Sequence, residues 1–515
     1  MEFALFCTRI NFIGLLLALL SPCKFIQSPM DFAPLNLLQT TNSASLDFGR
    51  IYFNSPSAVL RPHSPKEISL LLGFLSASSF SKVTVAARGA GHSIHGQAQA
   101  LNGIVIEMES LPPSIEIHRI GEGECGSSYA DVSGGTLWVE LLKESLKEGL
   151  APRSWTDYLY LSIGGTLSNA GISGQTFKFG PQISNILQLD VVTGTGELVT
   201  CSPHRSPELF YAVLGGLGQF GIITKARILL QEAPQKVKWV RAFYDNFEVF
   251  IEDQEFLVGM ADMVDYVEGF MVLNEDSFHG SFIAFPANLG FIPQLQPRDS
   301  HVYYCIEFAV YDQPDKATHL DQVVEEISRK LRFMPSLIYS VEVSYFDFLN
   351  RVRMEEQNLR GSGLWDVSHP WLNMFVPKAG ISQFKDLLLD NITPSTFKGP
   401  ILIYPILRDK WDPNTSAVLP DWKGSENIEY TVGMLRSASC SQQCLEDFMG
   451  QNRQITAKAT DPAGTIGAKQ YLPHYTKEEQ WRVHFGCKWQ QFVARKSAFD
   501  PLNILAPAQA IFKRK

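Results

Sequence analysis

Beyond its first 28 residues, this 515-residue sequence lacks a long apolar run, a dense basic cluster and the signature of a Rossmann domain. Charged residues make up only 19%, the net charge is −9, and the one basic cluster is the short Lys513-Arg514-Lys515 end. We therefore expect neither nucleic acid nor an anionic membrane surface as a partner. Beyond residue 28 no segment is long and apolar enough to span a bilayer. The composition, 45% hydrophobic, is that of a globular chain with two or three domains.

Cysteine is also scarce, with eight residues in the whole chain. Cys7 and Cys23 fall in the N-terminal leader, and a chain of this size does not depend on disulfides for its core. Cys440 and Cys444 have the spacing of a local bridge or a metal pair, but no histidine or second cysteine pair lies nearby. We interpret them as structural or unpaired, and we predict no metal site.

The first 28 residues have the pattern of a signal peptide. Arg9 precedes the apolar run 13–20, which is shorter than a membrane-spanning helix. A buried N-terminal helix is the alternative. We expect entry into the secretory pathway and an extracellular (apoplastic) location, with the vacuole and endoplasmic reticulum as alternatives. The triplets at Asn391 and Asn414 match the N-glycosylation pattern, which suits an exported glycoprotein.

The order of predicted elements indicates an α+β fold. Helices are expected at 65–76, 136–148, 207–214, 317–331 and 478–494, and short strands at 83–86, 104–106, 187–192 and 198–199. Of the 38 glycines, 21 lie between Ser81 and Gly221. From about residue 233 glycine thins out and aromatic residues increase, so we predict a domain boundary there.

Three glycine-rich loops carry the chemistry. They span residues 88–97, 155–174 and 215–223. Glycines in the first loop allow backbone N–H groups to face an anion such as a diphosphate, and His92 stands in its middle. Asp157, among aromatic residues, is either a satisfied structural acceptor or a base with a raised pKa. Each loop is a weak signal alone, but together they predict a large nucleotide cofactor.

The chain resembles the plant cytokinin dehydrogenases (cytokinin oxidases), flavoproteins of the vanillyl-alcohol oxidase type. The matching stretches occur in family order along nearly the whole chain after the leader. They are residues 91–98 (GHSIHGQA), 155–159 (WTDYL), 164–171 (GGTLSNAG), 265–270 (DYVEGF), 369–377 (HPWLNMFVP) and 500–507 (DPLNILAP).

The resemblance implies a two-domain protein with covalently attached FAD. Residues 29–232 and the C-terminal segment 471–515 would form a PCMH-type FAD-binding domain, and residues 233–470 a substrate cap domain. His92 would be joined to the 8α-methyl group of the flavin. The remaining cofactor contacts would be Ala87, Gly89, Ala90, Gly91, Ser93, Gln97, Asp157, Ser162, Ser168, Ile172, Ile223, Tyr471 and Gln509.

The implied reaction is the oxidative cleavage of cytokinins, which are adenines with an isoprenoid substituent on N6. Asp157 would accept the N–H hydrogen bond or proton of the side-chain amine, and Glu268 would hold the purine. Trp371 and Asn373 would form the pocket near the flavin. The products would be adenine and an aldehyde, the electron acceptor a quinone or oxygen, and the protein a monomer.

Simpler interpretations remain for single residues, and two other functions remain for the whole chain. Glu268 could be a solvated strand carboxylate and Trp371 a core aromatic residue, and His95, His369, His474 and His484 are interpreted as structural. The alternative functions are a related covalent-FAD oxidase of alcohols or sugars, and a non-catalytic flavoprotein that binds the hormone. Ala90 and Ala508 depart from the usual family residues, and an alanine with positive φ would be strained by roughly 1 kcal/mol or more.

Overall fold

The computed structural model describes residues 35, 37–38, 41–78, 82–121, 126–274, 277, 285, 302–312, 319–421, 426–439 and 442–514. The predicted signal peptide, residues 1–28, lies outside these ranges, as does Cys440. In the described parts of the chain every helix is too short or too polar to cross a bilayer.

The chain up to residue 232, here called the glycine-rich half, contains two sheets. The smaller has the order β1 (Leu37–Leu38), β2 (Ala58–Leu60), β4 (Ile104–Glu107), β3 (Val85–Arg88). Strands β2, β4 and β3 are parallel, and helix α2 (Pro65–Ala77) supplies the crossover between β2 and β3. The apolar residues of α2 pack with these strands in one buried cluster.

The second sheet of the glycine-rich half is antiparallel and has six strands. Its order is β5 (Ile115–His118), β6 (Tyr129–Ser133), β10 (Gly221–Glu232), β8 (Ile186–Thr193), β9 (Leu198–Cys201), and β7 (Leu150–Pro152) pairs with β10. The connections between these strands contain α3 (Trp138–Lys147), α4 (Ile163–Leu167), α5 (Thr176–Phe179) and α6 (Pro207–Val213).

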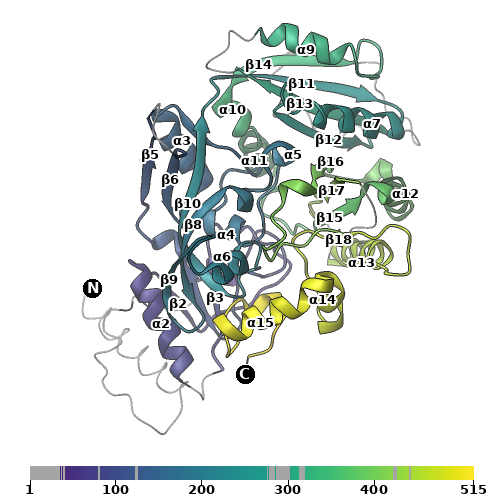
Figure 1. The fold of residues 1–515 in the computed structure, drawn as a ribbon. Helices are drawn as coiled ribbons and strands as arrows, with labels where there is room; N and C mark the ends of the chain where they lie inside the picture. The colour runs from purple at the N-terminus through teal and green to yellow at the C-terminus, as the bar shows by residue number, and fades with distance from the viewer. Residues whose placement is uncertain are drawn as a thin grey trace.

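The part of the chain from residue 233 to residue 470 is here called the cap half. Its centre is an antiparallel sheet of eight strands (Figure 1). The strand order is β14 (Ile338–Ser344), β11 (Lys236–Tyr244), β13 (Tyr303–Tyr311), β12 (Tyr266–Val272), β16 (Ile401–Leu407), β17 (Ile428–Met434), β15 (Leu372–Pro377), β18 (Lys469–Gln470). One face is covered by helices. These are α7 (Phe247–Val258), α9 (Leu320–Ser328), α12 (Ile381–Asn391) and α13 (Gln442–Ala459).

The two faces of the cap sheet bury different residues because side chains alternate along a strand. Val267 and Ile403 join the apolar cluster under the helices. Tyr266 and Tyr404, on the opposite face, belong to the core cluster of the glycine-rich half. Helices α10 (Tyr345–Leu349) and α11 (Val352–Gly361) also lie on the side of the glycine-rich half (Figure 1).

The C-terminal segment returns to the glycine-rich half. Helix α15 (Trp489–Phe499) lies beside α6, with Phe492 at 4.7 Å from Phe220 between ring centroids. Farther on, the N–H of Val85 donates to Ile504 (2.8 Å) and the N–H of Ala506 to Val85 (3.0 Å), so the segment pairs with the edge strand β3. These contacts are compatible with the domain boundaries given above, which stay a prediction.

Most predicted elements are confirmed, including α2, α3 and α6 at nearly the expected bounds. The single helix predicted at 478–494 is wrong. Gly486 has a φ of +52°, which ends α14 (Glu478–Phe485), and a 3-10 turn separates it from α15. Of the two interpretations of Cys444, structural or unpaired, the structure supports the structural one, since Cys444 is disulfide-bonded.

Candidate active site

The first glycine-rich loop presents a row of free backbone donors. Within the described part of the chain, no protein group accepts a hydrogen bond from the N–H groups of residues 89–93. Asp47 fixes the loop by accepting from Ser93 Oγ (2.9 Å) and from the N–H of Gly96 (2.6 Å). Gly91 has a φ of +67°, and a Cβ there would collide with the Arg88 guanidinium. Such a row of donors suits a diphosphate.

The other two loops meet the first at the same place. A Cβ on Gly89 would collide with Ser162, the N-cap residue of α4. The N–H of Gly215 donates to Leu167 (2.9 Å), and that of Leu217 to Ser168 (2.8 Å). The tertiary structure therefore brings the three loops, separated by some 130 residues in sequence, into one lining.

The remaining predicted cofactor residues lie around this lining. Ile223, the third residue of strand β10, lies close to Gly164, and Ile172 is buried. Gln509 arrives with the C-terminal segment, and its buried Oε1 has no partner among the described residues. Neither Ala90 nor Ala508 has a positive φ, so the strain considered for them does not arise. The free N–H groups and the unpaired Gln509 oxygen fit a long, polar ligand such as FAD.

His92 stands in a group of rings, here called the His92 group: Phe48, Tyr158, Trp365, Trp371 and His369. Phe48 stacks on His92 at 4.0 Å between ring centroids and on His369 at 4.1 Å. Tyr158 is 5.0 Å from His92, and Trp365 and Trp371 are each 6.1 Å away. Burial, reinforced by His369, lowers the pKa of His92 to about 3. The imidazole is therefore neutral and keeps a nucleophilic nitrogen.

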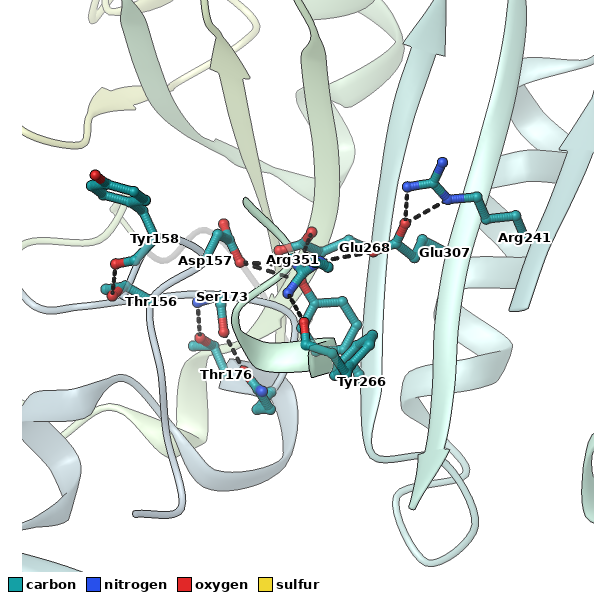
Figure 2. Close-up of polar contacts among 12 residues, drawn as sticks. Thr156, Asp157, Tyr158, Ser173, Thr176, Arg241, Tyr266, Glu268, Glu307 and Arg351 are labelled. Atoms are coloured by element: carbon teal, nitrogen blue, oxygen red, sulfur yellow. Dashed lines mark hydrogen bonds and ion pairs between the residues drawn. The ribbon is translucent and has the colours of Figure 1, made fainter. Parts of the chain in front are cut away.

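Asp157 and Glu268 meet at a second group, here called the carboxyl cluster (Figure 2). Nη2 of Arg351 lies 3.6 Å from Asp157 Oδ1 and 3.4 Å from Glu268 Oε2. The Tyr266 hydroxyl accepts a hydrogen bond from Arg351 and donates to Asp157 Oδ1 (3.2 Å). The loop 155–174, strand β12 and the N-terminus of α11 thus each contribute to one site.

The cluster extends through a second ion pair. Glu307 on β13 lies with Oε1 3.4 Å from Arg351 Nε, and with Oε2 2.6 Å from Arg241 Nη2 on β11. Side chains of Glu307, Arg351 and Arg241 retain only 4%, 7% and 5% of their exposure. With Asp157 and Glu268, three carboxyl groups therefore share two guanidinium groups. One proton on the carboxyl groups would balance the charge.

The pKa directions place that proton on Glu268. Burial, followed by the charge of Asp157, raises the pKa of Glu268 far above its usual range. Burial also raises the pKa of Asp157, but Arg351 and hydrogen bonds from Glu268 and Tyr266 oppose this. Burial alone would lower the pKa of Arg351, and its anionic neighbours raise it, so it stays charged. Asp157 is thus the member that ionises more readily and, with 27% of its side chain exposed against 8% for Glu268, the accessible one.

Trp371 of the His92 group lines a cavity of about 1090 Å³, together with Asn373 and Tyr471. The N–H of Tyr471 donates to Asn373 (2.9 Å), and the Tyr471 ring is 4.9 Å from Phe375. Neither His92 nor the pair Asp157 and Glu268 lines this cavity. The cavity therefore adjoins the reactive groups without containing them, and we place the chemistry at the carboxyl cluster.

Several residues of the site were missed by reasoning from the sequence. Arg351 lies in a charged stretch that looks like an exposed helix, and nothing in the sequence marks it out. Glu307 is the only charged residue of strand β13, a pattern typical of a buried ion pair that could have indicated it. Arg241 shares strand β11 with Lys236 and Lys238, so its charge does not stand out in the sequence. Glu355 also lies close to the cluster, and burial raises its pKa to about 7.

Side chains of metal-ligand type also gather at Glu116, His118 and Asp131, on β5 and β6. Asp131 accepts two hydrogen bonds of 2.8 Å from Arg227, and Lys225 lies 3.4 Å from it. The carboxylate is therefore satisfied by cations of the protein, and we assign no metal to this group.

Two family models match the chain. One, described as an FAD binding domain, covers residues 56–202. The other, described as "Cytokinin dehydrogenase 1, FAD and cytokinin binding", covers residues 234–512. The first contains the glycine-rich loops 88–97 and 155–174, with His92 and Asp157, and the second contains Glu268 and Arg351.

Curated relatives match over almost the full length. Cytokinin dehydrogenase 3 of Oryza sativa subsp. japonica is 65% identical over 519 residues, covering 100% of this chain and 98% of the relative. Cytokinin dehydrogenase 1 of Arabidopsis thaliana is 46% identical, covering 92% and 81%.

Solved structures of much lower identity share the fold. Chitooligosaccharide oxidase superimposes with a TM-score of 0.67 at 15% identity, covering 98% of this chain and 100% of the other. 6-Hydroxy-D-nicotine oxidase from Arthrobacter nicotinovorans gives a TM-score of 0.64 at 18% identity, covering 92% and 96%. Both are oxidases, and their likeness supports the two-part fold alone.

Proposed function

Because the chain belongs to the cytokinin dehydrogenase family, we propose that it uses FAD to oxidise the N6 side chain of cytokinins, releasing adenine and an aldehyde. The observation that carries this proposal is the pairing of an accessible carboxyl group, Asp157, with a more deeply buried one, Glu268, whose pKa is raised well above its usual range, beside the His92 group. An amine oxidation needs a proton acceptor of this kind next to a hydride acceptor.

FAD would lie along the lining formed by the three glycine-rich loops. The N–H groups of residues 89–93 would hold its diphosphate, with Ala87, Gln97, Ser162, Ser168, Ile172 and Ile223 along the rest and Tyr471 and Gln509 closing it. When bound, FAD supplies the acceptor for the hydride of the substrate.

His92 would attach the flavin covalently at its 8α carbon. Its neutral imidazole, with pKa about 3, can act as the nucleophile at neutral pH. The new C–N bond replaces one imidazole N–H and one methyl C–H. The two protons and two electrons released leave through the same electron acceptor that turnover requires, a quinone or oxygen.

Asp157 would act as the base. As the exposed anion of the cluster it can accept the N–H proton of the substrate amine while the C–H hydride departs. Arg351 and Tyr266, both in contact with its Oδ1, hold the carboxylate in place. The resulting imine is then hydrolysed by water.

Glu268, Trp371 and Asn373 would bind the cytokinin. The single O–H of a protonated Glu268, which otherwise donates to Asp157, can turn to a ring nitrogen of the bound purine, and an ionised carboxylate has no proton to donate. Glu268 Oε1 is buried and has no hydrogen-bond partner among the described residues, so it is free to take a ligand.

The decisive experiment mixes purified protein with isopentenyladenine without oxygen. We expect the yellow flavin absorbance to bleach, and adenine and the matching aldehyde to appear in equal amounts. Glucose and a simple benzylic alcohol serve as controls for the related sugar and alcohol oxidases. Bleaching by a control but not by isopentenyladenine would contradict the proposal, and a yellow protein that binds isopentenyladenine without bleaching would indicate a hormone-binding flavoprotein.

We further propose that the protein is exported as a monomeric glycoprotein to the apoplast, with the vacuole or endoplasmic reticulum as alternative destinations. Asn414 is exposed, which favours glycosylation there, whereas Asn391 is half-buried and donates to Leu387 (2.8 Å). Expression in plant cells, with glycosidase treatment of the secreted protein, tests both points. Protein retained in the cytosol at its unmodified mass would contradict them.

A further inference from the structure

Glu356 on α11 is a buried carboxylate that the proposed reaction does not use. Its side chain is 1% exposed, yet it accepts three hydrogen bonds. Tyr158 donates from its hydroxyl (2.7 Å), Arg360 from Nε (2.8 Å), and Arg353 from Nη1. Burial raises its pKa, but these donors outweigh burial and lower the pKa overall. Glu356 is therefore a fixed anion with a defined partner on the glycine-rich half.

The partner of Glu356 belongs to the His92 group. The Tyr158 ring lies 5.0 Å from His92 and 5.7 Å from Trp365 between centroids. Its hydroxyl points to α11 while its ring packs on the imidazole. Because its hydroxyl is hydrogen-bonded and its ring is packed, the Tyr158 side chain has few accessible rotamers.

Helix α11 holds two consecutive residues of the loop 155–174. Arg351, its N-cap residue, contacts the Asp157 carboxylate at 3.6 Å. Glu356, little more than one turn farther along, binds the next side chain, Tyr158. One helix of the cap half therefore sets the position of both the base and the ring beside the flavin-attachment residue.

We propose that Glu356 is a positioning residue, which acts through Tyr158 to orient His92 for attachment to the flavin. The neutral imidazole must present one nitrogen to the 8α carbon, and the adjacent Tyr158 ring restricts its rotation. Without the hydrogen bond to Glu356, the phenol ring is free to tilt, and His92 loses that restraint. The inference rests on the proposed covalent attachment.

The test compares Tyr158→Phe and Glu356→Gln with a matched control. Tyr158→Phe removes only the hydroxyl and keeps the ring beside His92, so the fold is preserved. The control is Tyr244→Phe, since Tyr244 donates to buried Asp253 (2.9 Å), which is also paired with Arg332 (2.8 Å). This is the same arrangement of tyrosine, carboxylate and arginine, under the helices of the cap half and away from His92.

The readouts are the fraction of bound flavin that stays with acid-precipitated protein, kcat and KM for isopentenyladenine, and the melting temperature. For Tyr158→Phe and Glu356→Gln we expect covalent attachment to be slower by about tenfold or more, and kcat to fall more than KM changes. Melting temperatures should stay close to that of Tyr244→Phe, which attaches flavin normally.

Two results would overturn the inference. One leaves the proposed function intact, and the other also contradicts the proposed covalent attachment. If Tyr158→Phe attaches flavin as fast as Tyr244→Phe, Glu356 has no positioning role, while the proposed function stands. If wild-type protein releases all of its flavin in acid, the proposed covalent attachment is itself wrong.

Discussion

The His92 group is partly buried and the carboxyl cluster mostly buried, and burial shifts their pKa values in opposite directions. It lowers the pKa of His92 to about 3 and raises the pKa values of Asp157 and Glu268. In both cases the neutral form is favoured, because desolvation penalises charge of either sign. The difference lies in the neighbours: rings surround His92, whereas the positive charge of Arg351 opposes the rise in the pKa values of Asp157 and Glu268. One half of the site therefore offers a neutral nucleophile and the other an anionic base.

Removing the nucleophile should have the largest effect. His92→Ala should leave no flavin covalently attached, because no other side chain of the His92 group has a nucleophilic nitrogen aimed at the same place. The measurement is flavin retained after acid precipitation. His369→Asn is the comparison, since His369 stacks on Phe48 and is held by Trp365 (3.0 Å), and full retention in His92→Ala would contradict the assignment.

Removing the anion from the carboxyl cluster should leave the flavin in place and stop the chemistry. For Asp157→Asn we expect flavin reduction by isopentenyladenine to slow by about 10²–10⁴-fold, the usual contribution of a general base. Stopped-flow measurement of flavin bleaching without oxygen tests this. Glu268→Gln, which keeps a hydrogen-bond donor, should mainly raise KM, and unchanged reduction in Asp157→Asn would remove it from its role.

Removing the cation should destabilise the carboxyl cluster. Arg351→Met leaves Asp157, Glu268 and Glu307 with less positive charge in a buried site, and we expect a loss of about 3–5 kcal/mol in unfolding free energy. Denaturant unfolding measures it. Arg329→Met removes an exposed pair with Glu325, both more than 60% exposed, and should change stability by less than about 1 kcal/mol.

The smallest expected effect is on the pH dependence of stability. It tests directly that burial lowers the pKa of a histidine and raises the pKa of a carboxyl group. Burial, with Lys469, lowers the pKa of His484 to about 3. In the unfolded chain His484 binds a proton near pH 6.5, whereas in the folded chain it stays neutral until about pH 3. The free energy of unfolding therefore falls as the pH drops from about 7 toward 3. At pH 5 this amounts to about 2 kcal/mol for one imidazole.

His484→Phe should remove that acid sensitivity, because its ring neighbours Tyr475, Trp481 and Phe485 accept an apolar ring. The measurement is the melting temperature at pH 7 and pH 5 for both proteins. The carboxyl cluster has the opposite sign: raised carboxyl pKa values favour the folded state at low pH and lose that advantage as pH rises through them. If the melting temperature falls equally between pH 7 and pH 5 in His484→Phe and in the wild type, His484 is not the source of the acid sensitivity.

Reasoning from the sequence identified the loops and the reactive residues but not their supports. Short-range glycine patterns at residues 89, 91 and 171 indicate backbone that must turn or approach a neighbour closely, and the structure has Gly91 and Gly171 at positive φ. Helices α2 and α6 begin with a proline, a signal readable from sequence. The break at Gly486 was missed because a single glycine is often tolerated within a helix.

The sequence by itself determined the α+β fold and the three glycine-rich loops, and it marked His92 and Asp157 as the residues with suitable chemistry, because these depend on local patterns of glycine and polar residues. Only the tertiary structure decided the ionisation of the site. Arg351, Glu268 and Asp157 lie up to 194 positions apart in the chain, and which carboxyl group keeps a proton depends on distances of 3–4 Å between them. Burial and Coulomb interactions act through space, and no periodicity in the sequence records them.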